Sequence, residues 1–293
     1  MTPAGSGPFV VALGGGHGLA STLGAARRYA GTLTAVVSVA DDGGSSGRLR
    51  EIAGIPAPGD LRRCLVAMAA DGSPWAPAFE YRFPVGSGDL EGHALGNLVI
   101  AGLANVTGDF ARALELAGEL LGAIGEVVPA TEVPVVLKAE VAGREVVGQV
   151  AVSETYGLIT CVSIVPPDAT VPDAALDAVA AADQVVMGPG SLYTSVLAVV
   201  AVPGIRAALE ARRAGRVYVC NLRPQLPETA GFDDAAHLKA LLDHGIPVDV
   251  MVTEGEEATY EIAGVRVVRA PVGRPDGDGH DPAGLAAVLA RLT

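Results

Sequence analysis

The sequence predicts an α/β protein: a doubly wound, Rossmann-like, mostly parallel sheet with a β-hairpin insertion, formed as a single domain over residues 1–293. Three observations lead to this fold class. Short apolar runs alternate with helical stretches, as in consecutive βαβ units. Half of the residues are hydrophobic and only 4% are aromatic, which suits helices packed on a valine-rich buried sheet. No internal repeat or low-complexity linker divides the chain.

The first unit is a strand, a glycine-rich loop, a helix and a second strand. Residues 9–13 form an uninterrupted apolar run that ends at the glycines of residues 14–18. Residues 19–29 predict a helix, with two arginines near the C-terminus where positive charge is favourable. Residues 33–40 are a second apolar run with β-branched side chains, so the segment predicts a parallel βαβ unit.

The next segment is predicted to be a loop followed by helices. Residues 41–58 are rich in Gly, Ser and Pro and predict a long loop. Asp60 is the expected N-cap of a helix that continues through residue 70. Two further helices are expected, one from about residue 93 and one from about residue 109.

The second half opens with the predicted insertion, about residues 133–152. Two β-rich runs there flank Ala142-Gly143-Arg144, which predicts an antiparallel hairpin. The α/β alternation then resumes, with strands at 184–187, 216–221 and 248–253, helices at 233–243 and 282–292, and a hairpin at 260–268.

Charge and hydropathy limit the function classes. The net charge is −13 and no basic stripe is visible, so we expect no nucleic-acid partner. Residues 1–8 carry no basic residue, and the longest apolar stretch, 196–202, is far too short to span a bilayer. We therefore expect a cytoplasmic protein without membrane insertion. The scattered Cys64, Cys161 and Cys220 indicate small buried hydrophobes in a reducing compartment, not a disulfide framework or a zinc site.

Three polar or glycine-rich loops each follow an apolar strand. In a parallel sheet such loops meet at the carboxyl edge, where ligands bind. The first offers backbone amides to a phosphate and contains Gly14, Gly15, Gly16, His17, Gly18 and Leu19. It is neither a strict Rossmann fingerprint nor a Walker A loop. A simple tight turn is the alternative.

The second loop combines acids, hydroxyls and a cation. Its candidate ligand-binding residues are Asp41, Asp42, Gly44, Ser45, Ser46 and Arg48. The two carboxylates suit a ribose hydroxyl, or Mg²⁺ held together with ligand phosphates, although we assign no protein metal site. A solvated acidic turn is the alternative. The pattern Gly43-x-Ser45-x-Gly47 also matches a hydrolase nucleophile elbow, with His93 as a base, but the expected loop after it disfavours a serine hydrolase.

The third loop again offers amides and hydroxyls between a strand and a helix. Its candidate residues are Gly188, Pro189, Gly190, Ser191 and Thr194. A rigid helix entry with Ser191 as the cap is an equally good interpretation. Weaker candidates lie elsewhere: Asp60, Arg62, His93, Asn97 and Asn221. His93 and Asn97 are four residues apart and are expected to share one helical face.

Six segments together resemble the YvcK family of gluconeogenesis factors, which belongs with the CofD-like transferases. They are GGGHGL at 14–19, ADDGGSSGRLR at 40–50, PGDLRRCL at 58–65, GHALGNL at 92–98, GPGSLYTS at 188–195 and NLRPQLPET at 221–229. Two positions depart from the family pattern. His17 stands where a threonine is expected, and Ala198-Val199 replaces Pro-Asn.

The resemblance implies a Rossmann-like fold that binds a uridine-diphosphate sugar, such as UDP-N-acetylglucosamine. It also implies a role in cell shape and cell-wall precursor control, which leaves open a homo-oligomer and protein partners in cell-wall synthesis. The enzymatic branch instead transfers a 2-phospho-L-lactate group to a deazaflavin. Residues 41–47 resemble the regulatory branch, but both functions need the same phosphate-binding amides, so the sequence alone does not decide whether the protein is an enzyme.

Overall fold

The computed structural model describes residues 6–213, 215–277 and 279–293; residues 1–5, 214 and 278 of the predicted domain lie outside the described residues. An eight-stranded sheet runs through the molecule in the order β10-β11-β9-β8-β7-β1-β2-β3. Every neighbouring pair is parallel except β10 and β11, so the predicted mostly parallel sheet is confirmed. The strands are β1 (Phe9–Gly14), β2 (Thr32–Val37), β3 (Glu126–Pro129), β7 (Gln184–Met187), β8 (Arg216–Val219), β9 (Val250–Glu254), β10 (Ala258–Ile262) and β11 (Val265–Ala270).

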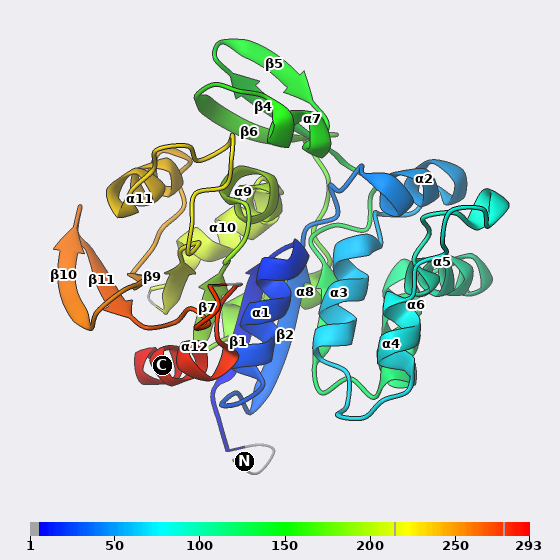
Figure 1. Ribbon diagram of the computed structural model, residues 1–293, viewed down its shortest axis with the longest axis horizontal. Helices are drawn as coiled ribbons and strands as arrows, with labels where there is room; N and C mark the ends of the chain where they lie inside the picture. Colours follow the sequence, from blue (N-terminus) through cyan, green and yellow to red (C-terminus); the bar gives the residue numbers. More distant parts are fainter. Residues whose placement is uncertain (1–5, 214, 278) are drawn as a thin grey trace.

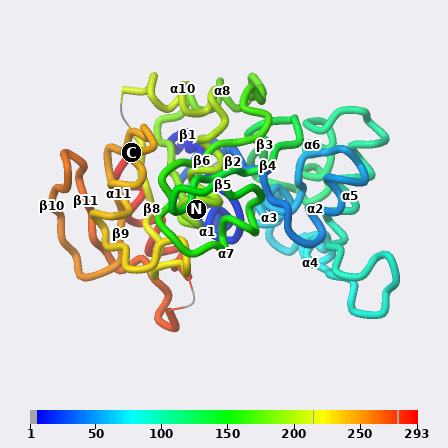
Figure 2. The backbone as a smooth tube through the Cα atoms, turned by 90° about the horizontal axis from the view of Figure 1, so that it is seen from above, coloured from blue at the N-terminus to red at the C-terminus, as the bar shows by residue number. Residues whose placement is uncertain are grey.

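Helices cover both faces of this sheet. Figure 2 shows α8 and α10 on one side of β1 and β2, and α1 and α3 on the other. The central strands are consequently buried on both faces, and Val10, Val11 and Leu13 of β1 are fully inaccessible. The helices are α1 (Gly16–Ala26), α2 (Gly44–Ala53), α3 (Gly59–Ala67), α4 (Trp75–Glu80), α5 (Leu95–Thr107), α6 (Phe110–Leu121), α7 (Gln149–Glu154), α8 (Asp173–Ala181), α9 (Leu197–Val200), α10 (Pro203–Ala211), α11 (Asp234–Asp243) and α12 (Pro282–Leu289), with short η1 (Gly88–Leu90), π-helical η2 (Leu192–Val196) and η3 (Ala290–Leu292).

The predicted insertion forms a separate small sheet. β4 (Val136–Val141) and β5 (Arg144–Val147) pair as the expected antiparallel hairpin. Its turn residues Ala142 and Gly143 have φ of 50° and 75°, as a two-residue hairpin turn requires. A third strand, β6 (Ile159–Val165), was not predicted, and the end of the predicted β insertion forms α7 instead. Figure 1 shows this small sheet above the main sheet, on the side of the molecule where α1 and α3 begin.

Three local predictions were wrong. Residues 44–53 are not loop but α2, because Ser45, Ser46 and Gly47 are buried by tertiary contacts that outweigh their weak helix preference. Asp60 is not an N-cap, since α3 begins at Gly59. His93 precedes α5, so it shares no helical face with Asn97.

Two further expectations concern cysteines and apolar helices. Cys64 and Cys220 are buried as expected, but Cys161 is exposed because it lies opposite Glu140 on the solvent-facing side of the small sheet. Among the described residues no single helix is long and apolar enough to cross a membrane. Leu192–Val200 and Pro203–Ala211 meet the length and composition criteria only as a pair, with a 78° bend between them.

Candidate functional site

The first and third loops touch through their backbones. A Cβ atom on Gly18 would lie 2.1 Å from the carbonyl oxygen of Pro189 and 2.8 Å from the Cα of Gly190. The Gly188 N–H donates to the Leu13 carbonyl at 3.1 Å, continuing the contact from β1. Only glycine allows this approach, so the two loops form one continuous backbone surface at the start of α1.

Buried side chains hold the third loop in place. Asn221 accepts a hydrogen bond from the Gly190 N–H at 2.9 Å and donates to the Gly190 carbonyl at 2.7 Å. The Ser191 hydroxyl caps η2 by accepting from the Thr194 N–H at 3.1 Å, as one interpretation of the sequence expected. The hydroxyls of Ser191 and Thr194 both donate to the Glu228 carboxylate. These side chains therefore shape the loop and leave its backbone as the binding surface.

In the second loop the two adjacent aspartates have different roles. Asp42 accepts from the N–H groups of Gln149 and Val150, both at 3.0 Å, and so caps α7 of the insertion. Gln149 Nε2 donates to the Thr194 carbonyl at 2.8 Å, which joins the insertion to the third loop as well. Asp41 accepts from the Gly43 N–H at 2.9 Å, and its second oxygen would lie 3.1 Å from a Cβ on Gly59.

Asp60 places a buried carboxyl group under the first loop. It is 5% exposed, and its Oδ2 would lie 2.5 Å from a Cβ on Gly15. Burial raises the pKa of Asp60 to about 6, although the ion pair with Arg63 (2.7 Å) opposes the shift and nearby Asp41 adds to it. A perturbed carboxyl group next to a glycine-rich loop is typical of a functional site.

Ser45 and His93 begin a buried hydrogen-bonded network. Ser45 Oγ lies 3.0 Å from His93 Nδ1 and accepts from Asn97 Nδ2 at 3.0 Å. Arg62, 1% exposed, donates from Nε to Asn97 Oδ1 at 3.0 Å and pairs with Glu80 at 2.6 Å. The network joins α2, α3, α4 and α5, and it uses the Arg62 guanidinium to hold Asn97 and Glu80.

Ser45 and His93 lie within hydrogen-bond distance, and α2 does begin at Gly44, next to Ser45, as a helix does at the nucleophile of a hydrolase elbow. The expected loop after Ser45 is therefore no longer a reason to exclude a serine hydrolase. Burial and the Arg48 charge lower the pKa of His93, so its imidazole is neutral at neutral pH. No carboxylate contributes to that shift, and Ser45 is 4% exposed. Among the hydrogen bonds of the described residues, none joins the His93 ring to a carboxylate, the group that orients histidine in serine hydrolases. The contacts of Ser45 with His93 and Asn97 instead hold the start of α2.

The remaining predicted residues lie at the border of the site. His17 is in the first turn of α1, where burial and the Arg63 charge lower its pKa. Arg48 donates to the Glu91 carbonyl at 2.6 Å. The structure thus brings together the first and third loops and Asp60, with Asp41 and Ser46 Oγ both beside Gly59 at the start of α3. Arg48 and Arg62 hydrogen-bond elsewhere, Arg48 to Glu91 and Arg62 to Asn97. Sequence reasoning missed Glu228, although it lies within the segment 221–229 that carried the family resemblance.

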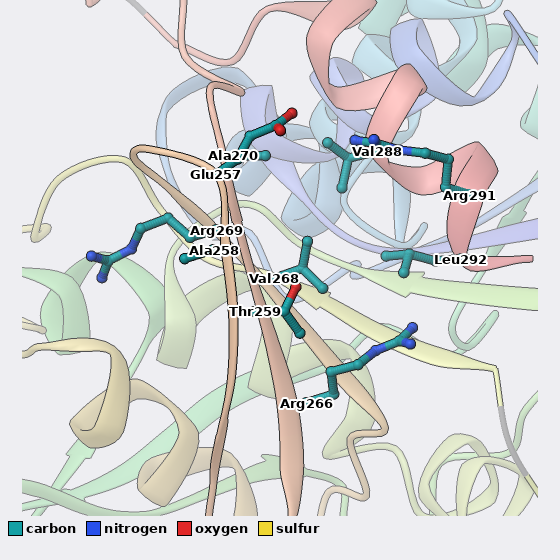
Figure 3. Close-up of a pocket in the computed structure, with 10 residues that line it drawn as sticks. All are labelled: Glu257, Ala258, Thr259, Arg266, Val268, Arg269, Ala270, Val288, Arg291 and Leu292. Atoms are coloured by element: carbon teal, nitrogen blue, oxygen red, sulfur yellow. The ribbon is translucent and has the colours of Figure 1, made fainter.

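The three loops coincide with neither a metal-binding cluster of the described residues nor the cavity drawn in Figure 3. Within the described ranges no three His, Cys, Asp or Glu side chains gather to hold a metal ion. A cavity of about 380 Å³ lies between the β10–β11 hairpin and the C-terminal residues Val288, Arg291 and Leu292. Figure 3 shows the side chains that line it. Its lining shares no residue with the three loops.

Comparisons with known proteins agree on one family. The family model described as 2-phospho-L-lactate transferase CofD matches residues 10–270. A protein of Mycobacterium tuberculosis strain H37Rv is 44% identical over 304 aligned residues, covering 96% of this chain and 89% of that protein. The gluconeogenesis factor of Halalkalibacterium halodurans is 42% identical over 247 residues, covering 83% and 76%. A crystal structure of a UPF0052 family member from Bacillus halodurans has a TM-score of 0.90 and 34% identity, covering 97% and 99%.

Proposed function

The chain belongs to the CofD-like superfamily and to its gluconeogenesis factors, the YvcK family, and from this premise we propose that it is a cytoplasmic regulator that binds a uridine-diphosphate sugar. In this proposal the ligand favours one conformation or partner surface, and through it the protein affects cell shape and cell-wall precursor supply. Catalytic turnover of the ligand is not part of the proposed role.

The contact between Gly18 and the Pro189 carbonyl carries the proposal. It joins the N-terminus of α1 to the third loop. The Gly188 and Gly190 N–H groups are already bonded to Leu13 and Asn221, so the third loop offers a phosphate the N–H groups at the start of η2. Helix N-termini bind phosphate because their first N–H groups have no partner within the helix and because the positive end of the helix dipole lies there. Glycine-rich backbone allows the phosphate to approach these groups closely. A diphosphate is long enough to use both loops, with one phosphate against each.

The carboxylates beside the loops fit the rest of such a ligand. Asp41 and Asp60 lie next to the first loop, where they suit sugar or ribose hydroxyls. They also fit Mg²⁺ if the phosphates complete its oxygen shell, because Mg²⁺ is usually held by one or two carboxylates together with substrate phosphates. When bound, Mg²⁺ would offset the repulsion between these carboxylates and the diphosphate.

Uridine-diphosphate sugars should raise the melting temperature. A ligand with a concentration of 100 times its dissociation constant stabilises the folded state by about 2.7 kcal/mol. A thermal-shift panel of uridine-diphosphate sugars, nicotinamide dinucleotides and ATP, each with and without Mg²⁺, measures this. A shift with ATP or a dinucleotide alone would refute the uridine specificity, and native mass spectrometry of the freshly purified protein would then identify the nucleotide that it carries.

The second candidate function is transfer of a phospholactyl group to a deazaflavin, supported by the family model over residues 10–270. We expect no product when a deazaflavin and Mg²⁺ are incubated with a uridine-diphosphate sugar or with a nucleotide-activated 2-phospho-L-lactate, whose nucleotide would be the leaving group, since His93 is buried and already bonded to Ser45. Chromatography of the incubation checks this expectation. Steady product that disappears in Asp41→Asn, which retains an oxygen for the Gly43 N–H, would instead place the protein among the transferases.

A further inference from the structure

A groove runs along β3, and none of the residues that line it belongs to the three loops. Its cavity of about 880 Å³ is lined by all four residues of β3, by α6 and by residues 171–174 at the start of α8. Figure 2 shows β3 at the end of the sheet, beside α6. Across residues 6–213, 215–277 and 279–293, the only strand paired with β3 is β2. The groove therefore follows an open edge of the main sheet.

The outward backbone groups of β3 can be assigned from its register. Ala130 donates its N–H to the Val37 carbonyl at 2.8 Å, and Val128 is paired with Val36. Because N–H and C=O groups of successive residues alternate in direction, Glu126 and Val128 also face β2. Val127 then directs its N–H and C=O, and Pro129 its C=O, into the groove. One more strand would find a donor and two acceptors there.

The walls of the groove are apolar and its rim is acidic. Leu65, Leu114, Val127 and Val171 supply apolar surface. Five carboxylates lie among the lining residues, and none of the described lining residues is basic: Glu115, Glu119, Glu126, Glu132 and Asp173. Arg112 pairs with Glu115 at 2.7 Å and with Glu119 at 3.2 Å, so it offsets one of the five charges.

We propose that this groove binds an extended segment of a partner protein, in which basic residues alternate with β-branched apolar residues, as a ninth strand on β3. Main-chain hydrogen bonds to the sheet edge provide the affinity of such complexes, and alternate side chains provide the specificity. Apolar side chains of the segment fit the groove, and its basic side chains meet the acidic rim. A second copy of this chain is a poor occupant, because its net charge is −13.

The test uses a fluorescent Lys-Val-Lys-Val-Lys-Val peptide and the full chain, followed by anisotropy. We expect saturable binding that a Glu126→Gln/Glu132→Gln double variant weakens about five- to tenfold, since exposed ion pairs contribute little each. The matched control, Glu210→Gln/Glu261→Gln, removes two exposed carboxylates away from the groove and should bind as the wild type does. Hydrogen exchange should show protection at Val127 when the peptide is bound.

Two comparisons separate strand addition from general attraction to an acidic protein. A peptide that is N-methylated at every backbone amide keeps its charge but has no N–H group to donate to β3 on either edge, so we expect its binding to be lost. Equal binding of the methylated peptide, or equal weakening by both double variants, would overturn the proposal, as would the absence of peptide binding. A dimer in sedimentation velocity that disappears in Glu126→Gln/Glu132→Gln would assign the groove to a second copy and also overturn it.

Discussion

Gly18→Ala is expected to lower the affinity for a uridine-diphosphate sugar by at least about a hundredfold. The new Cβ would lie 2.1 Å from the Pro189 carbonyl oxygen. Neither atom can move without its backbone, so the first and third loops must separate. A diphosphate could then reach the amides of one loop only. Losing two charge-assisted hydrogen bonds costs about 3 kcal/mol or more, which corresponds to this change in affinity. Isothermal titration measures it.

The same substitution should lower the free energy of unfolding by about 1–3 kcal/mol, the usual cost of overpacking. Gly24→Ala is the matched control on the same helix. Its Cβ would meet only Pro282, at an ordinary 3.9 Å, so we expect unchanged affinity and a gain of about 0.5–1 kcal/mol from helix propensity. If folded Gly18→Ala binds the ligand with wild-type affinity, the two loops do not hold the ligand together.

The parallel sheet could be predicted because its signal is local. The apolar runs of β1 and β7 are continuous and end at glycines, and the run of β2 ends just before Asp41 and Asp42. Helix α2 gave no such signal, because Gly44, Ser45, Ser46 and Gly47 are poor helix formers in isolation. They are helical here because Ser45 contacts His93 and Asn97, 48 and 52 residues further along the chain. Contacts of this range leave no periodicity in the sequence.

The site shows the same division between local and distant information. Glycine-rich loops after strands were enough to predict which loops meet. The sequence could not separate the roles of Asp41 and Asp42, because the partner of Asp42 is α7, more than 100 residues away. It could not show that Glu228 accepts from Ser191 and Thr194 either. Such pairings depend on the packed structure alone.

Asp60→Asn should change how the stability of the protein depends on pH. The folded-state pKa of about 6 lies above the ordinary value of 3.8, because burial disfavours the carboxylate. Below pH 3.8 the carboxyl group is protonated in both states and contributes no difference. Between pH 3.8 and 6 only the folded state keeps the proton, so stability falls as the pH rises. Above pH 6 the full cost of the buried carboxylate, about 3 kcal/mol, is present.

Asparagine has nearly the same shape and carries no charge, so it avoids this cost. We expect the free energy of unfolding of Asp60→Asn, relative to the wild type, to rise by about 2.5 kcal/mol between pH 4 and pH 7. The ion pair with Arg63 forms only with the ionised carboxylate, so its effect is already contained in the pKa of about 6. Urea titrations at four pH values measure the difference. Asp71→Asn is the control for the loss of a carboxylate as such, since Asp71 is 96% exposed.

Parallel stability curves for the wild type and Asp60→Asn would show that Asp60 titrates normally. If the predicted difference is found, the buried carboxylate costs stability at neutral pH, which is expected where a group is retained for binding. A ligand complex containing Mg²⁺ favours the ionised carboxylate, so it should stabilise the wild type at pH 7.5 more than it stabilises Asp60→Asn. Equal stabilisation of both proteins by the uridine-diphosphate sugar and Mg²⁺ would separate Asp60 from the ligand site.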